Sequence, residues 1–289
     1  MRQIGAHVSA AGGIENTPKR AKDIGCNSMQ LFSGSPRVWK KPDLASHDTD
    51  NFFSEQEKYG VSAVFTHAIY LVNLASDKPE LVDKSVATLK YDLAFDALVK
   101  GSGAIVHLGS HQGRGWEAVK NQVANSIGEI IDASPKKATF LIENSAGQKG
   151  KIASDLEEIR WLIDEVDSPQ LGWCFDTCHA FTAGYALGEK SQISESKNSR
   201  SQSALEAIES LGLWETLKCI HVNDSRDEFG SGRDRHDNLG QGNIPQVDFK
   251  YFFNHPQVKL IPLLLEVPGF DKKGPDAKNV ELLKQFLED

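Results

Sequence analysis

Histidine and acidic side chains recur where the apolar segments of this sequence end. The segment CFDTCHAF shows the pattern most densely, because Asp176 and His179 stand three residues apart directly after an apolar run that ends at Phe175. Neutral imidazoles and carboxylates are the ligand set expected for zinc, with manganese as an alternative. The residues that extend the pattern along the chain are His7, His67, His107, Glu143, His221, Asp234, His236 and Glu266.

The elements that carry these residues are apolar, β-prone runs, which alternate with amphipathic helical patterns. The longest helical pattern is VDKSVATLKYDLAFDALVK, and Asp155 and Ser201 are expected at or near helix N-caps. Long loops are expected over 181–202 and 223–245. The predicted strands are Gln3–His7, Ser28–Phe32, Val61–Thr66, Ala104–Leu108, Thr139–Ile142, Leu171–Phe175, Leu217–Val222 and Leu260–Leu265.

Eight strands alternating with helices predict a parallel sheet with right-handed crossovers. Eight such units in 289 residues fit one (β/α)8 TIM barrel, a single domain over residues 1–289. The alternative is an open doubly wound sheet, which usually has a glycine-rich phosphate turn after its first strand. The segment SAAGGIEN has paired glycines but no GxGxxG pattern, so the sequence favours the barrel.

The carboxyl ends of all strands in a parallel barrel open on one face, where active sites are built. The histidines and carboxylates at the strand ends are therefore expected to converge. Such a cluster is costly unless its polar groups are compensated, and divalent cations supply that compensation. Among the other histidines, His7 is expected just outside the ligand shell, and His111 as a phosphate contact or an outer donor. His47 and His255 are expected to be structural or solvated.

Composition places the chain among globular proteins, with 39% hydrophobic and 25% charged residues. No apolar run approaches the roughly 20 residues that span a bilayer, and the N-terminus does not resemble a signal peptide. A cytoplasmic protein without a membrane partner is expected. The four cysteines are too scattered for a disulfide scaffold and are expected as buried thiols. The net charge of −8 by itself argues against a nucleic-acid partner, although bound metal would change the local charge.

Seven motifs in this chain together resemble the endonuclease IV family of apurinic/apyrimidinic endonucleases, from residue 4 to about residue 270. The motifs are IGAHVSAAGG, HLGSH, IENSAGQ, FDTCHAFTAGY, HVNDS, DRHDNLGQGNI and LLLE. The resemblance implies a (β/α)8 barrel that holds three zinc ions and cleaves DNA 5′ to abasic sites. Such an enzyme would leave a 3′-hydroxyl and would also trim blocked 3′ ends.

The resemblance also implies a ligand set for each ion, with manganese as an alternative at one site. Glu143 would bridge the first two ions and, with Glu266, would also orient the nucleophile. Divalent cations lower the pKa of water enough to supply hydroxide near neutral pH. The first ion would bind His67, His107 and Glu143, the second Glu143, Asp176, His221 and Glu266, and the third His179, Asp234 and His236.

Duplex DNA containing an abasic site is the partner that the resemblance implies, and the protein is expected to be a monomer. Arg37, Tyr70 and Leu71 match the positions that enter the minor groove and help to flip out the abasic nucleotide. Three zinc ions would carry six positive charges against four ligand carboxylates. The site would therefore be cationic in an acidic protein.

Two other functions are weighed against this one. The first is a sugar isomerase or epimerase on the same barrel, which usually holds one or two cations; the triad of His179, Asp234 and His236 argues against it. The second is a non-catalytic DNA-binding protein, which would have no need for nine ligands on one rim. The number of bound metal ions would distinguish the nuclease from the isomerase or epimerase. Cleavage of abasic duplex would distinguish it from the non-catalytic DNA-binding protein.

Overall fold

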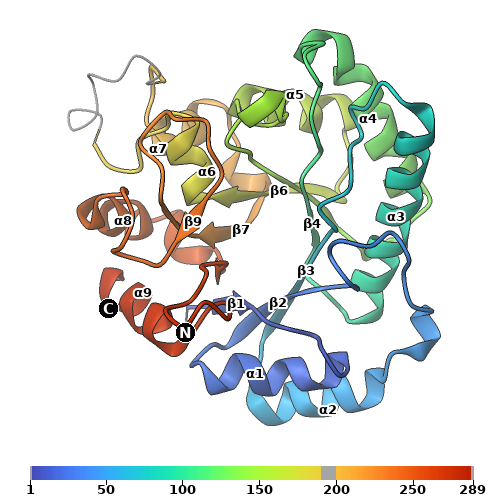
Figure 1. Cartoon of the computed structure of the whole chain (residues 1–289), viewed down its shortest axis with the longest axis vertical. Coiled ribbons are helices and arrows are strands. Elements are labelled where there is room, and N and C mark those ends of the chain that lie inside the picture. The colour runs from blue at the N-terminus through green and yellow to red at the C-terminus, as the bar shows by residue number, and fades with distance from the viewer. Residues whose placement is uncertain (1, 190–199, 288–289) are drawn as a thin grey trace.

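A computed structural model describes residues 2–189 and 200–287 of the chain. Eight parallel strands form a closed barrel in the order β1-β10-β7-β6-β5-β4-β3-β2, and helices surround it (Figure 1). The predicted (β/α)8 fold is confirmed, and the open doubly wound alternative is wrong because β1 pairs with both β2 and β10. Within the described residues, no helix combines the length and the hydrophobicity that crossing a membrane requires.

The barrel strands lie where the apolar runs predicted them, and half of their ends differ by one to three residues. The strands are β1 (Ile4–His7), β2 (Ser28–Phe32), β3 (Ala63–His67), β4 (Ala104–Val106), β5 (Phe140–Glu143), β6 (Leu171–Asp176), β7 (Leu217–Val222) and β10 (Leu263–Leu265). A short antiparallel pair, β8 (Asp224–Ser225) and β9 (His236–Asp237), lies within the predicted 223–245 loop.

Helices follow every barrel strand, and three of them, α2, α6 and α8, were not predicted from the sequence patterns. In α2 only Phe52 is buried, which leaves little amphipathic signal. Asp155 caps α5, and Ser201 lies two residues before the cap of α7, which is Ser203 in a capping box with Glu206. The helices are α1 (Thr17–Asp23), α2 (Thr49–Tyr59), α3 (Pro79–Leu98), α4 (Trp116–Asp132), α5 (Leu156–Val166), α6 (Thr177–Thr182), α7 (Ala204–Ser210), α8 (Gln246–Phe253) and α9 (Ala277–Phe286).

A small apolar layer fills the inside of the barrel. Its members are Ala63, Phe65, Ile105, Leu141, Cys174, Cys219 and Leu264, which form a cluster of their own. Side chains alternate between the two faces of a strand, so a residue two positions further on points inward again, one layer higher. All four cysteines are free and buried in the structure, as expected.

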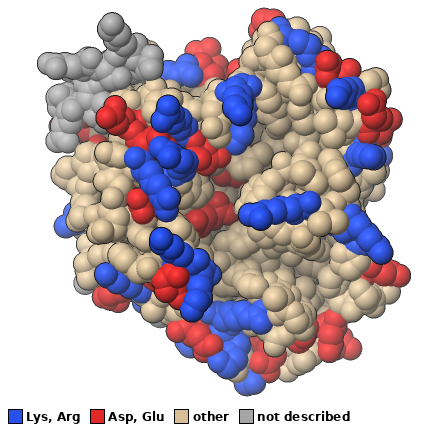
Figure 2. All heavy atoms as spheres, in the orientation of Figure 1, with Lys and Arg blue, Asp and Glu red and all other residues tan. Residues whose placement is uncertain are grey.

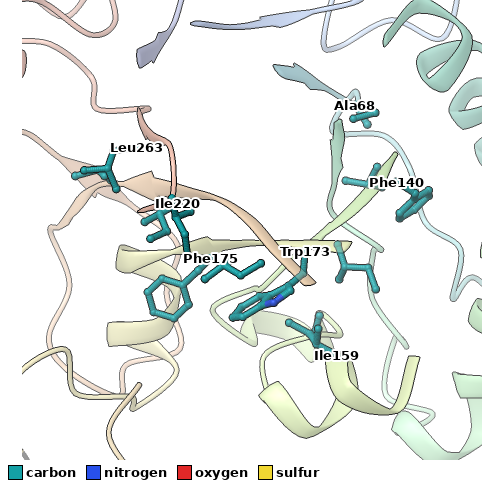
Figure 3. Close-up of a cluster of buried hydrophobic side chains, with 14 of the residues drawn as sticks. Ala68, Phe140, Ile159, Trp173, Phe175, Ile220 and Leu263 are labelled. Carbon is teal, nitrogen blue, oxygen red and sulfur yellow. The ribbon is translucent and has the colours of Figure 1, made fainter. Parts of the chain in front are cut away.

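The larger core fills the space between the strands and the surrounding helices. Trp173 and Phe175 are the chain neighbours of the inward-facing Cys174, and both belong to this outer layer. In Figure 3 they lie beside Ile220 of β7 and Ile159 of α5. The Phe175 ring stacks on Phe252 of α8, with 5.0 Å between the ring centroids. This apolar shell holds the strands in register. The register in turn fixes which side chains the strand ends direct into the mouth of the barrel.

Candidate metal centre

Six of the predicted ligands lie at the carboxyl ends of six barrel strands. Each stands two residues after a member of the inner apolar layer, so strand alternation turns each of them into the mouth of the barrel. His67, for example, follows Phe65, and Asp176 follows Cys174. The six are His67, His107, Glu143, Asp176, His221 and Glu266.

The first cluster joins His67, His107 and Glu143. The Nε2 atoms of both imidazoles lie 3.2 Å from Oε2 of Glu143. Glu143 is 1% exposed and His67 is 3% exposed, so water can compensate little of this charge.

The second cluster shares Glu143 and extends across the barrel to Asp176, His221 and Glu266. Nδ1 of His221 lies 3.0 Å from Oε1 of Glu143 and 3.2 Å from Oε2 of Glu266. Oδ2 of Asp176 is 3.9 Å from the same nitrogen. Glu143 therefore presents one oxygen to each of the first two clusters, which is the geometry of a bridging carboxylate.

The third cluster lies beside the second and uses the loop that carries β9. Nε2 of His179 lies 3.1 Å from Oδ1 of Asp234 and 3.5 Å from Nε2 of His236. Oδ2 of Asp176 is 3.7 Å from Nε2 of His236, so Asp176 faces this cluster as well as the second. Asp176 also caps α6, because its Oδ1 accepts from the backbone N–H of His179 over 2.8 Å.

The hydrogen bonds around the histidines test whether these clusters fit a metal. Nδ1 of His67 donates to the carbonyl of Ala68 over 2.7 Å, which leaves the lone pair on the nitrogen that faces Glu143. His179 donates in the same way to the carbonyl of Asn144 over 2.9 Å. Nε2 of His221 donates to the side-chain oxygen of Gln30 over 2.7 Å. In these three, lone pairs and carboxylate oxygens face one another, so the donor set fits a divalent cation.

The pKa shifts of the clustered residues also fit a site for divalent cations. Burial opposes ionisation of Glu143, but His107 and His221 beside it hold its pKa well below the usual range. Burial likewise opposes charge on His221, yet Glu266 and Glu143 raise its pKa to about 10. Burial lowers the pKa of His107 to about 4. The ionised carboxylates attract positive charge, which protons or divalent cations can supply, so metal binding must release protons.

Three buried amides orient the ligands, and the sequence analysis did not single them out. Nδ2 of Asn223 donates to Oδ2 of Asp176 over 2.7 Å, and its Oδ1 accepts from the backbone N–H of Glu266 over 3.1 Å. Asn144 brackets the backbone of Asp176 with bonds of 2.6 and 3.1 Å. Gln30 donates to Oε1 of Glu266 over 2.5 Å. A polar residue within an apolar strand, as in SMQLF, is the signal that could have revealed Gln30.

His7 and His111 lie outside the three clusters. Nδ1 of His7 is 3.3 Å from Oε1 of Glu266 and 2.8 Å from Nε2 of Gln30, so His7 touches a candidate ligand directly. Nδ1 of His111 instead accepts from the backbone N–H groups of Gly113 and Gly115, each over 3.1 Å. His111 contacts its own loop and the loop around Gly150. A Cβ atom at Gly150 would clash with the His111 ring, so only glycine leaves room for the ring there.

The three predicted DNA contacts lie on two loops that touch each other. The backbone N–H of Tyr70 donates to the carbonyl of Pro36 over 3.1 Å, next to the exposed Arg37. The Tyr70 side chain is 59% exposed, whereas Leu71 packs partly against the core. A buried ion pair of 2.5 Å between Lys41 and Asp92 joins the Arg37 loop to α3.

The chain matches known proteins over almost its whole length. The model of the xylose isomerase-like TIM barrel family matches residues 18–288. A protein of Methanoculleus marisnigri named probable endonuclease 4 is 34% identical over 288 residues, which cover 99% of each chain. The chain belongs to the endonuclease IV family. The resemblance read from the sequence motifs is confirmed.

A solved structure of an endonuclease IV family member supports the same assignment. Endonuclease IV from Thermus thermophilus is 31% identical to this chain and covers 98% of both chains, with a TM-score of 0.83. A D-tagatose 3-epimerase-like protein superimposes with a TM-score of 0.73 at 16% identity. That second likeness shows the shared barrel alone, and it gives no support for the isomerase alternative.

Proposed function

We propose that this chain is a zinc-dependent endonuclease of base-excision repair. It hydrolyses the phosphodiester 5′ to an abasic site in duplex DNA, leaves a 3′-hydroxyl and trims blocked 3′ ends. The observation that carries the proposal is the set of three adjoining clusters at the barrel mouth, which share Glu143 and Asp176. A chain of the endonuclease IV family with this arrangement is best explained as a metal-dependent phosphodiester hydrolase acting in the cytoplasm.

The proposed ligands follow the three clusters, with zinc in each and manganese as an alternative in one. Divalent cations bound here would lower the pKa of a water molecule and neutralise charge on the phosphate. Asp176 lies within reach of the second and third clusters, which adds one candidate ligand to the third set expected from the sequence. Asp176, His179 and His236 form a compact group of candidate ligands, and Asp234 lies 3.1 Å from His179 and 3.6 Å from His236. The ligand set proposed for the third ion is therefore His179, Asp234 and His236, together with Asp176.

The chain's own residues set up the hydrolysis. Glu143 and Glu266 are held ionised next to His221, so both carboxylates would help to hold the metal and to orient the attacking water. Gln30 and Asn223 fix Glu266 from two sides, so little reorganisation is needed when the substrate arrives.

Recognition of the lesion is assigned to the two coupled loops near the mouth. Tyr70 and Leu71 would fill the gap left by the displaced abasic sugar, and Arg37 would contact the backbone. Lys and Arg side chains stand around a central hollow in which Asp and Glu side chains are visible (Figure 2). A basic border around an acidic, metal-binding floor would allow an acidic monomer to bind DNA.

The deciding experiment is cleavage of a labelled duplex that contains one tetrahydrofuran abasic analogue. We expect a single cut 5′ to the analogue, loss of cutting after treatment with a chelator and recovery with zinc. An otherwise identical duplex without the analogue is the control. Intact abasic duplex after incubation with fully zinc-loaded protein would reject the proposal. Interconversion of free ketoses by the same protein would favour the isomerase alternative.

A further inference from the structure

Lys151 places a positive charge at the edge of the third cluster. Its Nζ lies 3.0 Å from Oδ2 of Asp234, while the other oxygen of that carboxylate faces His179. The ammonium therefore sits on the far side of Asp234 from the imidazoles. The Lys151 side chain is 30% exposed, so the charge lies at the surface of the site rather than within it.

The backbone around Lys151 is held in place by a neighbouring loop. Residue 151 pairs with Ser110 in an isolated antiparallel bridge, and Oγ of Ser110 donates to the carbonyl of Lys149 over 2.6 Å. The next residue, Ile152, donates its N–H to the carbonyl of Gly109 over 3.1 Å. A long side chain on a backbone fixed in this way loses less conformational freedom when it binds a ligand than one on a free loop.

The Lys151 ammonium has more N–H donors than the described residues provide acceptors for. An ammonium offers three N–H donors, and within the described residues Asp234 is the acceptor recorded for it. A compact, strongly hydrated ammonium with open donors suits the non-bridging oxygens of a phosphate, which it can contact from any direction.

We propose that Lys151 is a phosphate-binding residue of this site, with its ammonium held ready by Asp234 and donating to a backbone phosphate of the bound DNA. The proposal rests on the proposed function and adds to it a contact of this chain beyond the metal ligands. The rival role for Lys151 is structural: it would only hold Asp234 in place for the third ion.

The salt dependence of DNA binding separates these two roles. Each phosphate contact adds roughly 0.9 to the slope of log affinity against log salt, or about eightfold in affinity between 1 M and 0.1 M salt. The probe is a duplex nicked on the 5′ side of a tetrahydrofuran analogue, titrated with zinc-loaded protein. We expect Lys151→Met to bind roughly eightfold more weakly at 0.1 M salt, with a slope reduced by about 0.9 and unchanged zinc content.

Two matched variants complete the experiment. Lys151→Arg keeps the charge and should keep the slope. Lys218→Met removes the same charge from an exposed residue near the start of β7, at the end of the barrel opposite the ligands, and should also keep the slope. An unchanged slope in Lys151→Met, or a reduced slope accompanied by loss of zinc, would overturn the proposal. A wild-type protein that does not prefer the abasic probe over intact duplex would instead reject the proposed function.

Discussion

The side-chain oxygen of Gln30 lies 2.7 Å from Nε2 of His221, in the interior of the barrel where neither side chain is exposed. In the neutral form of His221, this contact places the proton on Nε2 and so leaves Nδ1 free to face Glu143 and Glu266. Hydrogen-bond partners of this kind orient metal-binding imidazoles and raise their basicity.

Gln30→Met should therefore weaken zinc binding by about 10- to 100-fold, the usual effect of removing such a partner. Methionine keeps most of the volume of glutamine, so the apolar packing around β2 should survive. The measurement is competition for zinc with a chelator of known affinity. Gln170→Met is the control, because Gln170 is also buried but bonds to the carbonyls of Pro135 and Ala138. Equal zinc affinity in Gln30→Met and wild-type protein would contradict the assigned role.

His236→Ala should remove about one zinc ion per chain and most of the cleavage activity, and leave the fold intact. His236 lies on the β8–β9 hairpin outside the barrel, so its loss removes little packing. Elemental analysis and circular dichroism measure the two effects. His255→Ala, which alters a histidine stacked on Trp214 away from the clusters, should keep its full zinc content. Normal zinc content together with normal turnover in His236→Ala would refute the third ion site.

Tyr70→Ala should weaken binding to abasic duplex by about 1–3 kcal/mol, the range of base–aromatic stacking. The hydrogen bond from the backbone N–H of Tyr70 to the carbonyl of Pro36 does not involve the Tyr70 side chain. The two loops that carry Arg37 and Tyr70 should therefore stay together. Titrations of abasic duplex with wild-type protein, Tyr70→Ala and Tyr70→Phe give the comparison, and the phenylalanine variant should bind nearly normally.

Zinc content must be measured alongside the Tyr70 titrations. The Tyr70 ring also contacts His67, with 6.0 Å between the ring centroids. Loss of zinc in Tyr70→Ala would mean that the ring supports His67 rather than the DNA, and normal binding would mean that it only anchors its loop.

Asp96 should make the stability of the protein depend on pH. Burial raises the pKa of this carboxyl from 3.8 to about 7, although Thr66 donates to it over 2.9 Å. The neutral form is favoured in the folded state, so its stabilising contribution is fully present below pH 3.8. The contribution is lost as the pH rises through about 7.

Asp96→Asn keeps an acceptor for Thr66 and cannot ionise. Its free energy of unfolding relative to wild type should therefore rise between pH 5 and pH 8, by at most about 3 kcal/mol. Denaturant unfolding of both proteins at each pH gives the difference. A difference that is constant over this range would mean that Asp96 titrates normally in the folded protein.

Much of the fold and the convergence of the main candidate ligands could be predicted from the sequence because their signals are local. Strand alternation has a period of two, so an imidazole or carboxylate two residues after an inward-facing apolar residue must face the same interior. Phe65 and His67 illustrate the rule, as do Leu141 and Glu143. The alternation of strands with helices then required a parallel sheet, whose carboxyl ends gather these residues on one face.

The contacts that complete the site were decided only by the tertiary structure. Gln30 meets His221, 191 positions away, because β2 and β7 lie across the interior of one closed barrel. Lys151 meets Asp234 across 83 positions, because two loops return to the same rim. Residues this far apart carry no shared periodicity in the chain. Their meeting depends on barrel closure and strand register, which are set by the packing of the whole core rather than by any local segment.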